Sequence, residues 1–172
     1  MTIRSNIIMA MAAAALGATS AAAAPVSSPT PPAGRALLLI PLTLTKIDDL
    51  SFGSIIPSPV SGTVVINAVT GARTVAGGVT AMPSDVGRRA YFGGAGSPNQ
   101  LVIVTVTAPA VLTSPLGDTL TVLALTLDGP PLRSIDAVNR TFFFGVGGII
   151  QIGVDQPEGV YTSNYDVTAN YL

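Results

Sequence analysis

The chain has 172 residues, with 8 Lys and Arg against 9 Asp and Glu, and it contains no His, Cys or Trp. Catalysis by Ser-His-Asp or Cys-His groups is therefore excluded, as are ordinary zinc and iron–sulfur sites. A formal charge of −1 provides no basic patch for nucleic acid. A hydrophobic fraction of 48% with 10% charged residues also argues against a disordered chain.

The N-terminus predicts a cleaved signal peptide over residues 1–23. Arg4 is its only charge, residues 7–16 are apolar, and residues 18–24 are small. The apolar run is shorter than the roughly 20 residues that cross a bilayer. We expect cleavage after Ala22 or Ala23, export, and no transmembrane segment in the mature chain. The alternative is an Ala-rich helix of a cytosolic domain.

Residues 24–37 predict an extended N-terminal arm. Four of the eleven positions in 25–35 are proline, which fixes the backbone and removes hydrogen-bond donors. One domain is then expected over residues 38–172.

Period-2 alternation of apolar and polar residues dominates that domain. Strands are predicted over 38–45, 101–108, 119–127 and 161–171, with shorter ones at 50–56, 63–67, 89–92, 141–146 and 149–154. The 119–127 strand is apolar on both faces and is expected to be covered on both. Glycine clusters at 93–96 and 147–148 predict turns. The pattern predicts an all-β fold, an immunoglobulin-like antiparallel β-sandwich, with a closed barrel as the alternative.

The candidate chemical groups favour no enzyme. Asp48 and Asp49 would point to opposite faces of a strand and are expected to be solvated. Asp155 and Glu158 are too few for a convincing calcium loop. The glycine clusters have no helix after them to bind phosphate, and Lys46 is expected to be an exposed charge at a strand end. No catalytic residue, cofactor or metal is therefore predicted.

The C-terminal segment carries a resemblance to chaperone–usher pilins. Such pilins end in a strand with a penultimate aromatic residue and a glycine about fourteen places from the end. Here Tyr171 is penultimate, and Gly159 is the fourteenth residue counted back from Leu172. Between them Tyr161, Tyr165, Val167 and Ala169 share a face with Tyr171.

A second resemblance covers residues 40–172. The pieces Leu44-Thr45-Lys46, Asp49 to Gly53, Ser61 to Val64, Thr70 to Arg73 and Gln156 to Tyr161 resemble an uncharacterised family of exported bacterial domains associated with chaperone and usher components. The lack of cysteine and the proline-rich arm depart from many pilins.

The pilin resemblance implies a structural subunit of a surface fibre (pilus or fimbria) assembled by donor-strand complementation. A sandwich lacking one strand is completed by a segment of a neighbouring subunit. The implied partners are a periplasmic chaperone, an outer-membrane usher and further copies of the chain, on a route through the periplasm to the cell surface. The donor candidates are Leu38, Ile40, Leu42 and Leu44, with 26–33 as a less apolar alternative. The C-terminal strand, from Gly159 to Tyr171, would pair first with the chaperone and then border the donor.

Three alternatives stay open. Residues 38–45 could be the first strand of a complete sandwich. The chain could be a self-contained secreted adhesive or ligand-binding module, for which only Tyr91 and Phe92 lie near a glycine-rich loop. A hydrolase that uses carboxylates alone is the least favoured.

Overall fold

A computed structural model describes residues 26–31 and 33–172, and the predicted signal peptide lies outside these residues. Leu38–Leu172 forms one compact unit, and the described residues hold strands and no helix. The strands are β1 (Thr43–Asp48), β2 (Ile55–Ile56), β3 (Gly62–Ile66), β4 (Arg73–Gly77), β5 (Thr80–Ala81), β6 (Ala90–Ala95), β7 (Leu101–Thr107), β8 (Val111–Thr113), β9 (Thr119–Leu127), β10 (Leu132–Ser134), β11 (Thr141–Ile152) and β12 (Asp166–Tyr171).

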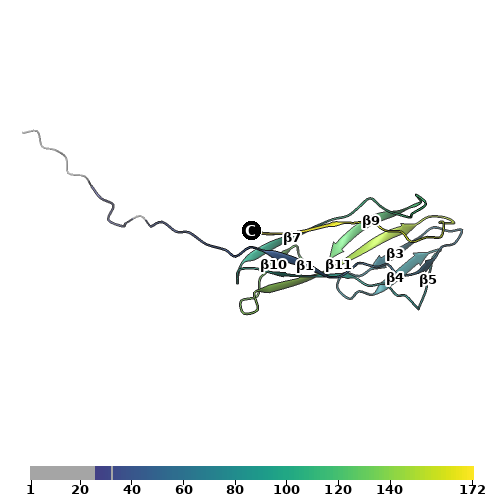
Figure 1. The fold of residues 1–172 in the computed structure, drawn as a ribbon, viewed down its shortest axis with the longest axis horizontal. Helices are drawn as coiled ribbons and strands as arrows, with labels where there is room; N and C mark the ends of the chain where they lie inside the picture. Colours follow the sequence, from purple (N-terminus) through teal and green to yellow (C-terminus); the bar gives the residue numbers. More distant parts are fainter. Residues whose placement is uncertain (1–25, 32) are drawn as a thin grey trace, which may run out of the picture. The chain divides into compact units, whose positions relative to one another are not determined.

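The strands form antiparallel sheets that pack as a sandwich, which confirms the predicted fold class. One sheet has the order β1-β6-β11-β3-β4, with β9 pairing β11 and β8 pairing β9. A second has the order β10-β7-β12, and β2 pairs β5. Within the compact unit, Figure 1 shows β1, β7 and β10 toward one end, β3, β4 and β5 toward the other, and β11 between them.

Strand β11 belongs to both halves of the fold. Its first part, from Thr141 to Val146, pairs β6, and its last part, from Gly148 to Ile152, pairs β3. The turn predicted at 147–148 is therefore wrong, as is the division into strands at 141–146 and 149–154. The glycines serve close packing: a Cβ on Gly147 would clash with the carbonyl oxygen of Ile66, and one on Gly148 would lie 2.8 Å from Leu125.

The other predicted glycine turn is also part of a strand. Strand β6 runs through Gly93 and Gly94, which pair with Phe143 and Phe142 of β11. A Cβ on Gly93 would lie 2.9 Å from the ring of Phe143. Glycine here makes room for aromatic rings on the neighbouring strand, a use that the sequence alone does not distinguish from a turn.

The interior consists of two clusters of apolar side chains. The first core cluster has its buried members on β6, β7 and β11 and in the loop after β10: Ala90, Phe92, Val102, Val104, Ile135, Phe142, Phe144 and Val146. The second core cluster lies mainly on β3, β9 and β11: Val64, Val79, Leu120, Val122, Ile150 and Ile152. Along each strand, the residues that face these clusters alternate with polar or exposed residues, because successive side chains of a strand point to opposite faces.

A β-bulge in β9 corrects the expectation that this strand is covered on both faces. Ile149 and Ile150 of β11 are opposite Ala124 and Val122, so Leu123 is the extra residue. The bulge shifts the phase of the alternation. Leu120 and Val122 before it, and Leu125 after it, can all face the core, while Leu123 is left 51% exposed.

The first strand starts later than predicted, at Thr43 rather than residue 38. Pro41 has no N–H to donate, and the N–H of Ile40 donates to the Ser97 hydroxyl (2.9 Å) instead of to a strand. The predicted strand at 50–56 is reduced to β2 and a bridge between Ser51 and Arg88. Strands β4, β5, β8 and β10 were not predicted because they are short or mostly exposed.

The C-terminal strand covers 166–171 rather than 161–171. Its alternation is as predicted: Tyr165, Val167, Ala169 and Tyr171 pack against the first core cluster. The Tyr171 hydroxyl donates to the Ile40 carbonyl (2.9 Å) and accepts from the Ser97 N–H (2.7 Å). One hydroxyl thus ties the last strand to the residues just before β1.

We predict that Tyr171→Phe lowers the free energy of unfolding by about 1 to 2 kcal/mol, because it removes two hydrogen bonds and leaves the Ser97 N–H without its acceptor. Urea denaturation measures the change. Tyr91→Phe is the matched control, since Tyr91 stacks on the half-exposed Phe143. An equal loss in both variants would contradict the role given to Tyr171.

Candidate functional site: a groove between two strand edges

Strands β1 and β12 are two of the edge strands of the sandwich, as are β4, β8 and β10. In the described part of the chain, β1 pairs β6 and β12 pairs β7, and neither has a second neighbour. Tyr171 contacts Ile40, whereas Tyr165 lies within electrostatic range of Asp49. The edge that begins at Ile40 and the C-terminal edge therefore run in opposite directions beside each other.

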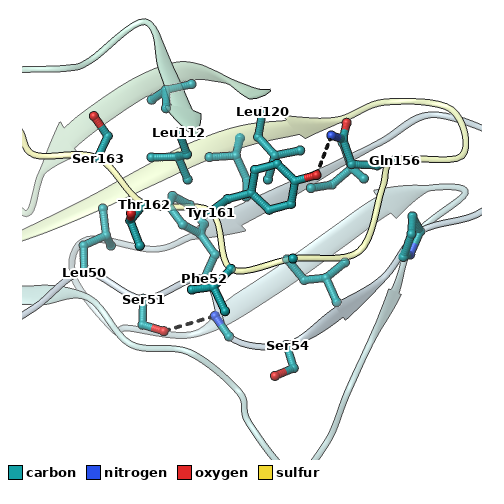
Figure 2. Close-up of a pocket in the computed structure, with 18 of the residues that line it drawn as sticks. Leu50, Ser51, Phe52, Ser54, Leu112, Leu120, Gln156, Tyr161, Thr162 and Ser163 are labelled. Atoms are coloured by element: carbon teal, nitrogen blue, oxygen red, sulfur yellow. Dashed lines mark hydrogen bonds between the residues drawn. The ribbon is translucent and has the colours of Figure 1, made fainter. Parts of the chain in front are cut away.

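A groove of about 630 Å³ lies past the end of β1 and before the start of β12. Residues 50–57 form its first wall and residues 157–165 form its second wall. We call the end at Leu50 and Tyr165 the closed end; at the other end, beside Pro57 and Pro157, the Asp155 N–H donates to the Ser58 carbonyl (3.0 Å) and joins the two walls. The floor is apolar and consists mainly of second-cluster residues: Leu112, Leu120, Val122, Leu125, Ile150 and Ile152. Figure 2 shows Leu112 and Leu120 on one side of the pocket and Ser51, Phe52 and Ser54 on the other.

The first wall is fixed by Arg73 of β4. Its guanidinium donates to four backbone carbonyls, those of Phe52 (3.1 Å), Ser54 (3.1 Å), Met82 (2.6 Å) and Asp85 (2.8 Å). Because the guanidinium is charged, these bonds are stronger than neutral ones. They hold the wall to the 82–85 segment behind it.

Glycine permits the close approach that this clamp needs. Gly53 has a φ of +73°, and a Cβ there would lie 2.5 Å from the Arg73 Nη1. Gly87 also has a positive φ, +72°, and a Cβ there would lie 2.5 Å from the Ser51 carbonyl oxygen of the first wall. An L side chain would be strained at either position and would push the wall away from Arg73.

The second wall is organised around Tyr161. Its ring packs on the second core cluster, and its hydroxyl donates to the Pro157 carbonyl (2.7 Å) and accepts from the Gln156 amide (3.0 Å). Figure 2 shows the ring extending into the pocket toward Gln156. The hydroxyl therefore fixes the backbone four residues upstream, in the irregular segment that precedes β12. The second wall pairs with the neighbouring sheet through one antiparallel β-bridge, between Thr162 and Thr113.

The closed end combines a carboxylate with a buried phenol. Asp49 forms an ion pair with Lys46 (2.5 Å), and its side chain is 65% exposed. The Tyr165 hydroxyl is enclosed and has no hydrogen-bond partner. Burial, and then the charge of Asp49, raise the pKa of Tyr165 to about 12.

The sequence-predicted donor residues fall into two environments. Leu42 and Leu44 are partly buried and pack against the first core cluster of their own chain. Leu38 and Ile40 are 88% and 46% exposed. Leu37 and Leu39 beside them are also exposed. The structure therefore separates an apolar run over 37–40 from the strand that follows it.

The C-terminal candidates are divided as well. Gly159, Tyr161 and Tyr165 line the groove, while Val167, Ala169 and Tyr171 cover the first core cluster beyond its closed end. Arg73 and Gln156 stood within the segments that carry the family resemblance but were given no role from the sequence. Nothing in the local pattern of Arg73 indicates a wall, because its partners lie 9 to 21 residues away; Gln156 bonds nearby Tyr161 and also the Thr119 carbonyl, 37 residues away.

The remaining chemical candidates lie apart from the groove floor. Asp48 and Asp49 are exposed at the end of β1. Within 26–31 and 33–172, no three acidic side chains come together as a metal site. Phe92 is buried, whereas Tyr91 stacks on Phe143 with ring centroids 5.9 Å apart on the outer face. Across the same residues, no helix has the length and apolar character needed to cross a membrane.

The chain belongs to a family described as a domain of unknown function, DUF4402, whose model matches residues 42–171. The match begins next to β1 and ends with β12, so it includes both walls of the groove and excludes the arm. No curated protein and no solved structure matches the chain. The family resemblance noted in the sequence is thus confirmed for the uncharacterised domain, and the comparisons do not link that domain to chaperone–usher systems.

We predict that the stability of the fold declines between pH 10 and about 12 through Tyr165. In the unfolded chain a tyrosine ionises near pH 10, whereas Tyr165 in the fold keeps its proton to about pH 12. Over that interval the unfolded state releases a proton that the folded state holds, so rising pH favours unfolding. Tyr165→Phe removes this contribution, and urea denaturation across the interval should show a flatter pH dependence. An unchanged slope would contradict the burial of the Tyr165 hydroxyl.

Proposed function

We propose that this protein is a structural subunit of a bacterial surface fibre and that its groove accepts an extended segment of another subunit. The observation that carries the proposal is the pairing of two features in one chain. The groove has an apolar floor between the walls at residues 50–57 and 157–165, and the exposed run 37–40 is apolar at every position. An inserted strand would place alternate side chains on the floor and hydrogen-bond to the second wall, because the backbone of the first wall is already bonded to Arg73 and to the segment behind it.

The groove and the run of the same chain lie too far apart to combine. Ile40 is held at the Tyr171 contact, and Leu50, where the groove begins, is ten residues further along the edge. Ten extended residues span about 33 Å. Leu38, two residues from Ile40, reaches back by about 7 Å at most. The run 37–40 that fills a groove must therefore come from another chain.

The proposed donor is shorter than the one suggested by the sequence. Leu42 and Leu44 cover the first core cluster of their own chain, and their removal would expose Phe92 and its neighbours. We therefore restrict the donor to the residues before Pro41: Leu38 is directed onto the neighbour's floor, and Ile40, whose N–H and carbonyl stay bonded to its own domain, lies at the end of that floor.

An open groove also explains why a chaperone would be needed. Apolar floor residues and unpaired strand edges are sites of aggregation when exposed. A periplasmic chaperone that pairs with the second wall would protect the groove until an outer-membrane usher exchanges it for the arm of the next subunit. This route places the mature chain at the cell surface and assigns it no catalytic activity and no cofactor.

We predict that replacing Leu38 and Ile40 with Asp abolishes multimers of the mature chain, because two charges cannot be buried on an apolar floor without a partner. SDS-resistant multimers, purified from the periplasm and separated without boiling, are the measurement. Replacing Val26 and Thr30 with Asp is the matched control in the same arm and should leave the multimers intact.

The urea midpoint of each variant shows whether the domain itself is unharmed. Soluble monomers from the unaltered mature chain, stable at high concentration, would contradict strand exchange. That outcome would favour the self-contained secreted module instead.

A further inference from the structure

Strand β4 is an edge of the larger sheet that lacks the usual protection against pairing with another chain. Edge strands of native proteins are protected by charged side chains, by proline, or by being very short. Elsewhere in the described chain one of these devices is present: β1 carries Lys46 and Asp48, β12 carries Asp166, and β2, β5, β8 and β10 have two or three residues each. Strand β4 has five residues, no proline and one charge. That charge, Arg73, is bound to four carbonyls of its own chain.

The free side of β4 presents backbone groups without partners. Just before β4, the Ala72 carbonyl accepts from the segment that follows β3 (2.9 Å), and just after β4, the Gly78 N–H donates to the segment that precedes β3 (3.1 Å). Because hydrogen-bonded positions alternate along an antiparallel pair, Thr74 and Ala76 bond to β3, and the N–H and carbonyl of Val75 point the other way. Among residues 26–31 and 33–172, no segment bonds to these two groups of Val75.

Side chains leave this edge open as well. Residues 74–77 are all exposed. Val75 is opposite Val64 of β3, a buried member of the second core cluster, and is itself 37% exposed. None of these residues lines the groove, and β4 and β1 lie toward opposite ends of the compact unit (Figure 1). A partner at β4 would therefore leave the groove and the residues before β1 free.

We propose that β4 pairs with β4 of a second copy, antiparallel and about a two-fold axis at Val75, so that the two larger sheets become one. The edge is self-complementary in this arrangement. The N–H and carbonyl of each Val75 bond the carbonyl and N–H of the other, and Thr74 is opposite Ala76. No like charges meet, because Arg73 is turned toward its own first wall. Any other axis would shorten the overlap of the two five-residue strands.

A single pair of this kind is weak, because five residues a side are far fewer than the roughly 20 to 30 of a stable interface. Two copies therefore associate reversibly. The pairing goes beyond strand exchange and does not require it. In the proposed fibre the same edge recurs in every subunit, so several pairs between two fibres would add to one another. The β4 contact would then join fibres side by side, while the groove joins subunits along each fibre.

Disulfide cross-linking tests the register, because the chain has no cysteine of its own. At the proposed axis the two Val75 Cα atoms lie about 5.5 Å apart, within the range that a disulfide spans. Under mild oxidation we expect covalent dimers of the mature chain with Val75→Cys, and mixed dimers from Thr74→Cys chains with Ala76→Cys chains. Thr74→Cys alone is the matched control and should give few dimers, because its two copies are offset along the strands. Dimers from Thr74→Cys but not from Val75→Cys would overturn the axis.

Proline at position 75 tests the bonds across the axis. Since the Val75 N–H points away from β3, Val75→Pro removes this donor and keeps the chain's own ladder. Sedimentation equilibrium of mature chains that also carry Leu38→Asp and Ile40→Asp measures the dimer without strand exchange. We expect a dimer whose dissociation constant Val75→Pro raises by about tenfold or more, since two hydrogen bonds are lost. Val75→Thr keeps the N–H and the branched shape, and it should leave the constant nearly unchanged. The urea midpoint shows that each variant is folded.

The two proposals fail in different ways. If the chain with Leu38→Asp and Ile40→Asp stays monomeric at about 1 mM, or if its dimer is unaffected by Val75→Pro, the β4 pairing is wrong. If the unaltered mature chain forms no SDS-resistant multimers but Val75→Cys chains form covalent dimers, strand exchange is wrong and the β4 pairing stands.

Discussion

The hydroxyl of Tyr171 is the contact on which the geometry of the domain depends. It joins the carbonyl of Ile40 on one edge to the last strand on the other and also accepts from the Ser97 N–H. Where this contact holds the edges together, Leu42, Leu44 and Val167 cover the first core cluster. In the other half the two walls lie on either side of the groove over the second core cluster, and the hydrogen bond from the Asp155 N–H to the Ser58 carbonyl joins them at their far end.

The two halves are covered by different elements. In the first half β1 and β12 supply Leu42, Leu44 and Val167. In the second half the irregular walls supply Phe52, Ile55 and Tyr161, and Leu120 and Ile150 below them are buried. A strand placed across the groove would therefore cover mainly the wall side chains and the partly buried Leu112 and Leu125. This replacement of strands by irregular walls is the physical basis for the proposed fibre subunit.

Much of the sandwich follows from local pattern, and the groove does not. The bounds of β9 and nearly those of β7 match the alternation in their sequences, and the C-terminal face from Tyr165 to Tyr171 has the predicted phase. The glycines at 93–94 and 147–148 were misassigned because a glycine needed for close packing has the same sequence signature as one in a turn. The bulge at Leu123 and the Arg73 clamp depend on partners distant in the chain. The groove depends on how segments distant in the sequence come together, and no short stretch of sequence contains that information.

The four carbonyls held by Arg73 have a consequence for affinity. They keep the first wall in one conformation whether or not the groove is filled, so an incoming strand does not have to order that side. The second wall is held as well, by the bridge at Thr162 and by the Tyr161 ring on the second core cluster. If the proposed strand exchange holds, a synthetic peptide that mimics the arm would meet two ordered borders, and stiffening the peptide itself is the most direct way to make it an assembly inhibitor.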